Sequence, residues 1–535
     1  MMEALGNLRR WGKSIAAVSA IAAVIAVAAC SGGGDASRGE FDILIVGGNV
    51  ADGGPGEMSV RHIGIRDGLI VDTDANEDAT ATTIIDASGL LVAPGFIDPH
   101  THALADLLSD TGNANLPFLM QGVTTVVVGN DGYGVPDLEF SLERMRGRGV
   151  GTNVAFYAGH NDIRSLVMGL ENRQATPEEL EEMRRIVAAQ MEAGALGLST
   201  GLYYTPGSYS STDEVVELAL VAARYDGLYD SHMRDESSYN IGLLGAVEEA
   251  IEIGERADIP VHIAHLKALG RDVWGQSGDI IARVEAARER GLEVTADQYP
   301  YPASGTNFKS ALVPAWVRAD SDEAMYERFA NRDLNERIRE EMTANLWRRG
   351  GADSLLVTGA DSEWRGKTLE AIAAELGADP IDAAVEAIRR GNPSIASFNM
   401  NPNDIAAIAI QSWVMTGSDG SGGHPRKYGT YPTVYRDMVL REGLFDVNRF
   451  VERSSGLVAD SLRLCDRGYL RDGLRADIVM IDLETYEPVA NFQEPAELAT
   501  GVVHTLINGR FAIRDREPQE DLTGEVIDRQ ALDCP

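Results

Sequence analysis

The sequence predicts an α/β fold: a (β/α)8 TIM-like barrel, a small flanking β-sandwich domain built from both chain ends, and a helical insertion before the last barrel strand. Three observations support this prediction. Eight apolar runs alternate with helix-like stretches, polar residues follow each run, and the two ends of the chain show the shorter period of antiparallel strands.

The eight strand-like runs are nearly continuous in apolar residues, as parallel strands buried on both faces are. In chain order they are LLVAPGFIDPHTH, VTTVVVGND, TNVAFYAGH, ALGLSTG, GLYDSHM, PVHIAHLK, LEVTADQYPY and SWVMTGSDG. Eight such units predict a (β/α)8 barrel, and their polar endings predict an active site at the carboxyl ends of the strands.

Helical spacing of apolar residues appears between the runs, for example in STDEVVELALVAARYDG and LGAVEEAIEIGERAD. In TPEELEEMRRIVAAQMEAG, Thr176 and Glu179 have the spacing of a capping box, so a helix is expected to begin there.

The regions outside the barrel follow other patterns. Residues 41–90 and 460–515 alternate like antiparallel strands and are expected to form one small β domain around a barrel at 91–459. Within the barrel range, about 310–410 is too long for one crossover and is interpreted as a helical insertion or lid, because KTLEAIAAELGADPIDAAVEAIRRG suits a helical pair. Residues 516–535 remain as a C-terminal tail.

The N-terminus has the pattern of an export signal. Residues 1–29 combine a basic start, a short apolar stretch and small residues before Cys30, which resembles a bacterial lipoprotein lipobox. An ordinary secretory signal with an incidental cysteine is the alternative. Residues 30–40 suit a flexible tether. We therefore expect an exported cell-envelope lipoprotein on the periplasmic side, touching the membrane only through a lipid on Cys30.

The net charge narrows the classes of binding partner, and the few cysteines limit the number of disulfides. The chain carries 82 acidic against 47 basic residues, a formal net charge of −35, which disfavours nucleic acid and anionic membrane surfaces. Apart from Cys30, the sequence contains only Cys465 and Cys534. They either form one bridge or stay as two free thiols.

Histidines and aspartates at the strand ends form the candidate site. His100 and His102 share one face of an extended segment, so their rings lean toward one point. The expected metal-binding set is His100, His102, Asp131, His232, His265 and Asp419. Imidazoles with carboxylates suit one or two Zn²⁺ ions, with Mn²⁺ or Co²⁺ as alternatives.

Several histidines and aspartates have plainer interpretations. His160 and His262 are read as hydrogen-bonded structural histidines, and Asp131 is either a ligand or a turn aspartate in NDG. Asp419 is interpreted as a ligand that also takes the proton from the attacking water, against a turn or N-cap role in SDGSGG.

Several longer stretches resemble the N-acyl-D-amino-acid deacylase (D-aminoacylase) family of the amidohydrolase superfamily. They are APGFIDPHTH, GVTTVVVGN, GLSTGLYYTPG, GLYDSHMRDE, VHIAHLK, DQYPY, GSDG with HPRKYGTYP, and RGYLRDGLRADIVMID. The resemblance runs from about residue 41 to about residue 515.

The resemblance implies roles for individual residues. His100 and His102 would hold one metal position together with Asp419, and His232 and His265 would hold the other. The family has a cysteine in a GNCG-like turn where this chain has Asp131, a departure that puts the ligand at this position in question.

The resemblance also implies a substrate site. Lys267 and Tyr299 would bind the substrate carboxylate, with Arg234 as a weaker candidate. Tyr204 and Tyr203 would line the acyl or side-chain pocket, or would simply pack at the barrel rim.

The expected activity is metal-dependent hydrolysis of N-acyl-D-amino acids to a carboxylic acid and a free D-amino acid. A D-dipeptidase or a cyclic-amide amidohydrolase is the alternative within enzymes. A metal-binding lipoprotein with impaired catalysis is the alternative from another class. Preferred side chain, acyl group, metal number and oligomeric state are left open by the sequence.

Overall fold

The structure, a computed structural model, describes residues 40–134, 138–532 and 534. The predicted signal peptide and all but the last residue of the predicted tether lie outside the described residues. Among the described residues, no helix combines the length and apolar character that crossing a membrane requires.

Parallel strands form the centre of the fold. Each of the eight predicted runs contributes a strand to at least one of two parallel sheets. One sheet holds β6 (Phe96–Asp98), β7 (Val123–Val128) and β8 (Asn153–Phe156); the other holds β9 (Ala158–Gly159), β10 (Gly197–Gly201), β11 (Leu228–His232), β12 (Val261–Ile263), β13 (Val294–Gln298) and β17 (Val414–Thr416). Only Tyr157 separates β8 from β9, and its N–H donates to Val128 O at 3.0 Å, so the third run continues from one sheet into the other.

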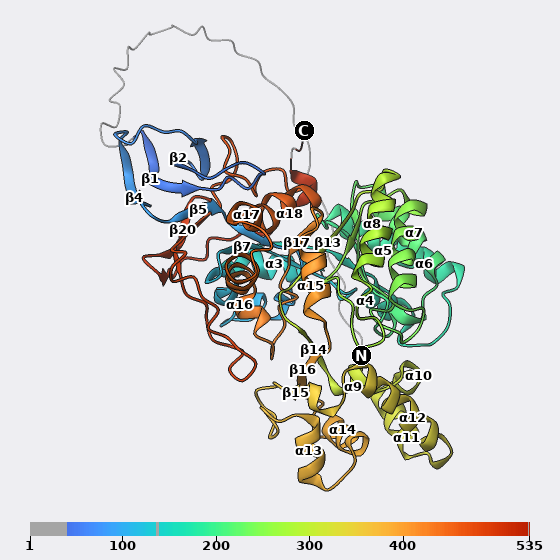
Figure 1. The fold of residues 1–535 in the computed structure, drawn as a ribbon. Helices are drawn as coiled ribbons and strands as arrows, with labels where there is room; N and C mark the ends of the chain where they lie inside the picture. The colour runs from blue at the N-terminus through green and yellow to red at the C-terminus, as the bar shows by residue number, and fades with distance from the viewer. Residues whose placement is uncertain (1–39, 135–137, 533, 535) are drawn as a thin grey trace, which may run out of the picture. The chain divides into compact units, whose positions relative to one another are not determined.

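Helices follow most of these strands, and Figure 1 shows several of them side by side. They include α4 (His160–Met168), α5 (Pro177–Glu192), α6 (Thr212–Ala223), α7 (Leu243–Ala257) and α8 (Ser277–Glu289). The predicted capping box is confirmed: Glu179 N–H donates to Thr176 Oγ1, and Thr176 N–H donates to Glu179 Oε2.

The two ends of the described chain share one nine-stranded sheet. It contains β1 (Phe41–Val50), β2 (Ser59–Arg66), β3 (Leu69–Asp72), β4 (Ala81–Asp86), β5 (Leu91–Pro94), β18 (Ile478–Ile481), β19 (Val502–Ile507), β20 (Arg510–Arg514) and β21 (Glu517–Pro518). The antiparallel pairing of β5 with β18 joins the early strands to the late ones, and Figure 1 shows β20 (red) near the blue strands.

The first predicted run was interpreted as one strand, which is wrong. Its first half is β5 in the nine-stranded sheet, and its second half is β6 in a parallel sheet. Gly95 lies between them, where a Cβ would fall 2.2 Å from the Thr124 side chain, so only glycine permits this change of sheet without a clash.

The insertion before the last parallel strand contains more than helices. Its helices are α9 (Phe308–Leu312), α10 (Ala315–Arg318), α11 (Asp322–Ala330), α12 (Arg332–Arg348), α13 (Leu369–Leu376) and α14 (Pro380–Arg389); the predicted helical pair corresponds to α13 and α14. An antiparallel sheet of β14 (Ala303–Asn307), β16 (Ser394–Phe398) and β15 (Leu355–Val357) accompanies them. The purely helical interpretation is therefore incomplete. The insertion has its own apolar cluster, which includes Phe308, Met342 and Trp364.

The C-terminal segment runs along the amino ends of the parallel strands. Gly524 forms a bridge with Val150, which precedes β8, and Val526 forms a bridge with Val154 within β8. Arg529 donates to Tyr225 O at 3.0 Å, just before β11.

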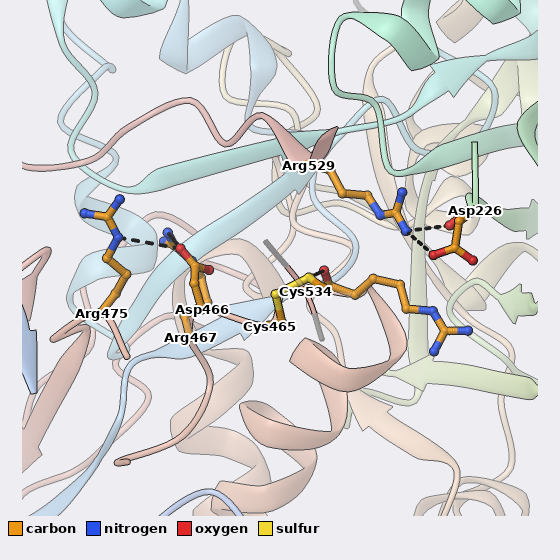
Figure 2. Close-up of a disulfide and its surroundings, with 8 residues drawn as sticks. Asp226, Cys465, Asp466, Arg467, Arg475, Arg529 and Cys534 are labelled. Atoms are coloured by element: carbon orange, nitrogen blue, oxygen red, sulfur yellow. Dashed lines mark hydrogen bonds and ion pairs between the residues drawn. A yellow bond between two sulfur atoms is a disulfide. The ribbon is translucent and has the colours of Figure 1, made fainter. Parts of the chain in front are cut away.

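A disulfide between Cys465 and Cys534 closes this segment, which answers the question that the sequence left open. Figure 2 shows the bridge with Arg529 and its ion-pair partner Asp226 nearby. Arg467, 2 % exposed, pairs with Asp477 in the same region.

Candidate metal centre and active site

The candidate site lies where the parallel strands end. His232 is the last residue of β11, His265 follows β12 by two residues, and Asp131 and Asp419 each follow their strand by three. His100 follows β6 by two residues. Because parallel strands share a direction, these side chains meet at one edge.

His100, His102, Asp131 and Asp419 form a first group whose donor atoms lie within 4.8 Å of one another. His102 Nε2 is 3.1 Å from Asp419 Oδ1 and 3.5 Å from Asp131 Oδ2. His100 Nε2 is 3.4 Å from Asp131 Oδ1 and 3.8 Å from Asp419 Oδ1. Two imidazoles and two carboxylates therefore face one point.

Asp131, His232 and His265 form a second group. Asp131 Oδ1 is 3.4 Å from His232 Nδ1 and 3.3 Å from His265 Nε2. Those two nitrogens are 2.8 Å apart. Asp131 thus belongs to both groups, with Oδ1 shared between them and Oδ2 facing His102.

Three residues of the cluster have left-handed backbone conformations. The φ angles are 58° at Asp131, 36° at His265 and 49° at Asp419. Such conformations cost free energy in residues other than glycine and concentrate at functional sites. Here each one turns the chain at a strand end so that the side chain joins the cluster.

The donor set fits a metal ion. Both ring nitrogens of His100 and the Oδ1 atom of Asp131 are buried and have no hydrogen-bond partner among the described residues. Buried polar atoms without partners are costly, and a cation between them would satisfy them. Imidazole nitrogens with carboxylate oxygens suit Zn²⁺, Mn²⁺ or Co²⁺.

Ionisation of the carboxylates also suits a cation. Burial alone would raise the pKa of Asp131, but the His100 and His232 rings hold that pKa well below its usual value. Burial likewise acts against Asp419, and the Arg426 guanidinium contributes most to lowering its pKa. Burial disfavours a charged His102, yet Asp131 and Asp419 raise its pKa to about 9, so a metal must displace a proton there.

A cavity of about 330 Å³ opens onto the cluster, and most of the predicted substrate-binding residues line it. Lys267 lines it, with Nζ donating to Glu236 Oε1 at 2.5 Å and to His265 O at 2.9 Å. Tyr299 lies beside Lys267, whose Nζ is 5.7 Å from its ring centre. Tyr204 also lines the cavity, its ring 4.6 Å from that of His232.

The structure does not bring Arg234 to this cavity. Its Nε donates to Glu249 Oε2 at 2.9 Å and its Nη2 to Glu249 Oε1 at 2.9 Å. With its charge paired there, Arg234 lies outside the lining of the cavity at the cluster.

Two residues near the cluster were not predicted from the sequence. Arg426 Nη1 is 2.7 Å from Asp419 Oδ2, and Glu236 holds Lys267. Both lie in stretches already quoted, HPRKYGTYP and SHMRDE, but neither ends a strand run, so periodicity supplied no signal for them.

His160 and His262, which are predicted to be structural, are both hydrogen bonded. His160 Nε2 is 2.9 Å from Glu214 Oε1. His262 Nε2 is 3.1 Å from Asp297 Oδ1, which also accepts from His265 N–H at 2.8 Å. Asp297 therefore positions the backbone of a cluster residue while it holds His262.

Comparison with known proteins gives three curated relatives of nearly the same length. Residues 83–513 match the model of the amidohydrolase family. The D-aminoacylase of Alcaligenes xylosoxydans xylosoxydans is 32% identical over 92% of this chain and 98% of its own length. The N-acyl-D-aspartate deacylase and N-acyl-D-glutamate deacylase of the same organism are 32% and 31% identical, over 92% of this chain and 96% and 97% of their own lengths.

Solved structures show the same similarity. The N-acyl-D-glutamate deacylase of Bordetella bronchiseptica, complexed with zinc and a phosphonate mimic of the tetrahedral intermediate, superposes with a TM-score of 0.79 at 30% identity, over 91% of this chain and 99% of its own. A D-aminoacylase structure gives 0.78 at 30% identity, over 91% and 100%. A D-hydantoinase at 17% identity shares the fold alone, with a TM-score of 0.51.

Proposed function

The chain belongs to the amidohydrolase family, and we propose that it hydrolyses the linear amide bond of N-acyl-D-amino acids, releasing a carboxylic acid and a free D-amino acid. The observation that carries the proposal is the cavity onto which four histidines and two aspartates converge. Relatives named for this activity span almost the whole chain.

We infer further that the eight parallel strand segments close into a (β/α)8 barrel flanked by a β-sandwich domain. Backbone contacts between the last and first strands support closure: Asp419 N–H donates to His100 O at 2.9 Å, and Thr101 forms a parallel bridge with Gly420. Closure would bring Asp419 beside the two histidines that follow β6.

In the proposed centre, His100, His102 and Asp419 would hold one metal position, and His232 and His265 would hold the other. Asp131 would belong to both positions, because its Oδ1 lies near His100, His232 and His265 and its Oδ2 lies near His102. Zn²⁺ is the proposed metal, with Mn²⁺ or Co²⁺ as alternatives for a site made of nitrogen and oxygen donors. When bound, the ion supplies Lewis-acid polarisation of the amide carbonyl and a water of lowered pKa.

Asp419 is the proposed proton carrier. Its Oδ2 is held by Arg426 Nη1, so Oδ1 is directed toward His102 and the cluster. Its carboxylate is ionised at neutral pH, the form that accepts the proton of the attacking water. The same oxygen then returns that proton to the leaving amine nitrogen.

Lys267 and Tyr299 are the proposed binding residues for the α-carboxylate of the substrate. Tyr299 Oη is buried and lacks a hydrogen-bond partner within the described part of the chain. Lys267 is positioned by Glu236 and His265. A phenol and an ammonium on one wall of the cavity suit an anionic group.

We also propose that the protein acts outside the cytoplasm, as an envelope lipoprotein anchored through Cys30. The disulfide between Cys465 and Cys534 is consistent with an oxidising compartment. The lipobox-like residues before Cys30 are the sequence support for the anchor.

Metal analysis with a hydrolysis screen tests the proposed activity. The purified protein is assayed on N-acetyl-D-amino acids, the L-isomers, a D-dipeptide and a hydantoin, before and after chelation and after zinc is restored. We expect cleavage of the D-acyl compounds that chelation abolishes and zinc restores. Equal cleavage of L-isomers or hydantoins, or turnover indifferent to chelation, would contradict the proposal.

A further inference from the structure

Arg349 is a buried cation in the wall of the active-site cavity. It follows the last residue of α12, is 4% exposed and lines the same cavity as Lys267 and Asp419. Its Nε donates to Tyr239 Oη at 2.8 Å, and its Nη1 donates to Ser304 Oγ at 3.3 Å. The Asn399 amide lies next to Nη1 as well, and its oxygen accepts when the amide is turned. All three partners are neutral.

Arg349 differs in this respect from the other cations of the cavity. Lys267 is paired with Glu236, and Arg426 is paired with Asp419. Over the described ranges, no carboxylate lies within ion-pair distance of Arg349. An uncompensated buried charge is unfavourable, so the fold retains a cation that only an incoming anion can pair.

Two aromatic rings separate Arg349 from the metal cluster. Its guanidinium carbon is 5.8 Å from the ring centre of Tyr239, whose ring is 5.6 Å from that of Tyr203. The Tyr203 ring lies 6.0 Å from His232. Arg349 is therefore placed to meet a part of the substrate distant from the reacting carbonyl.

We propose that Arg349 binds a second carboxylate, carried by the side chain of the D-amino acid, so that the preferred substrates are N-acyl derivatives of acidic D-amino acids. This inference rests on the proposed function. The α-carboxylate has its own partners in Lys267 and Tyr299, which leaves Arg349 for another anion. Nε and Nη1 are engaged by the neutral partners, so the N–H groups of Nη2 are the ones that would meet the incoming carboxylate.

The test compares two substrates of equal shape, N-acetyl-D-glutamate and N-acetyl-D-glutamine. In Arg349→Gln we expect kcat/KM for the glutamate substrate to fall at least about 30-fold, mainly through KM. The glutamine substrate should change less than about threefold. Arg348→Gln is the matched control: Arg348 Nε donates to Ser238 Oγ at 3.0 Å, and the residue lies outside the lining of this cavity. Arg348→Gln should leave kcat/KM unchanged for both substrates.

Two outcomes overturn the proposal. An equal loss on both substrates would assign Arg349 to the α-carboxylate or to structure. Unchanged kinetics on both would remove it from the site, while the proposed hydrolysis would stand.

Calorimetry with the free amino acids separates this proposal from the activity itself. D-glutamate and D-glutamine are titrated into zinc-loaded wild type and Arg349→Gln. Because neither ligand is consumed, the result holds even if no acyl amino acid is cleaved. Tighter binding of D-glutamate that Arg349→Gln abolishes supports the subsite, and equal binding of the two amino acids overturns it.

Discussion

The two ends of the parallel strands differ in the groups that gather there. At the carboxyl ends, His100, Asp131 and Tyr299 bury polar atoms that have no hydrogen-bond partner among the described residues, and Asp131 and Asp419 have left-handed backbones. At the amino ends, the C-terminal segment pairs its backbone with Val150 and Val154, and a disulfide closes it.

Apolar packing shows the same contrast. Ile527 and Leu532 of the C-terminal segment contact a buried cluster that includes Val127, Leu196 and Leu228 from near the strands. The lining of the cavity at the other end is rich in charged and phenolic side chains. The carboxyl ends bury polar atoms at a cost in stability because those atoms serve binding, whereas the contacts at the amino ends stabilise the strands. Substitutions at the two ends should therefore separate activity from stability.

The largest effect is expected for Asp419→Asn. The amide cannot accept the proton of the attacking water, so turnover should fall at least about 10³-fold, equivalent to about 4 kcal/mol in the barrier. Steady-state kinetics with N-acetyl-D-amino acids measures this. Because Arg426 loses its buried ion-pair partner, the free energy of unfolding should fall as well, so the kinetics are measured on protein shown to be folded. Turnover within tenfold of wild type would remove Asp419 from proton transfer.

Removal of the disulfide should affect stability alone. The bridge joins residues 69 apart in the chain. Its loss in Cys465→Ser with Cys534→Ser should lower the free energy of unfolding by about 2–4 kcal/mol, because the unfolded chain regains freedom. Denaturant titration gives the number, and activity at 25 °C should stay within about twofold. A loss of activity in the folded double variant would show that the two ends are coupled.

Arg529→Ala tests the same end without the covalent bond. Arg529 donates to Tyr225 O and pairs with Asp226 Oδ2 at 2.9 Å. Loss of these contacts should lower the free energy of unfolding by about 1–2 kcal/mol with unchanged kinetics. If the unfolding curve matched wild type, the C-terminal segment would not stabilise the strands in this way.

The smallest effect is expected for Tyr299→Phe at the cavity. The hydroxyl lacks a protein partner in the described structure, so its removal should leave the free energy of unfolding unchanged or raise it slightly. Loss of one hydrogen bond to the substrate carboxylate should raise KM about fivefold. The free energy of unfolding and KM are measured on one preparation. A destabilised variant with a normal KM would contradict the assignment of Tyr299 to substrate binding.

The sequence predicted the positions of the strands more accurately than the way the strands pair into sheets. Long apolar runs such as VTTVVVGND predicted parallel strands because burial on both faces removes the alternation of polar residues. The exchange of sheets at Gly95 and the pairing of β14, β15 and β16 depend on contacts between distant residues, which periodicity does not encode.

The same limit applies to the candidate site. His232 and His265 stand at strand ends, and that position alone predicted their meeting. Arg349 reaches the cavity from a helix end, where arginine is common for other reasons. Arg426 reaches it from the first position of α16 (Arg426–Thr433), which no strand run marks. Their placement follows from how the insertion and the last strand fold over the cavity.

Metal content of Asp131 variants tests the central claim most directly, since that side chain belongs to both donor groups. Elemental analysis of wild type, Asp131→Ala and Asp131→Cys should show bound zinc in the wild type, a loss of at least half in the alanine variant and recovery in the cysteine variant. Undiminished zinc in a folded Asp131→Ala protein would contradict the claim that this carboxylate joins the metal centre.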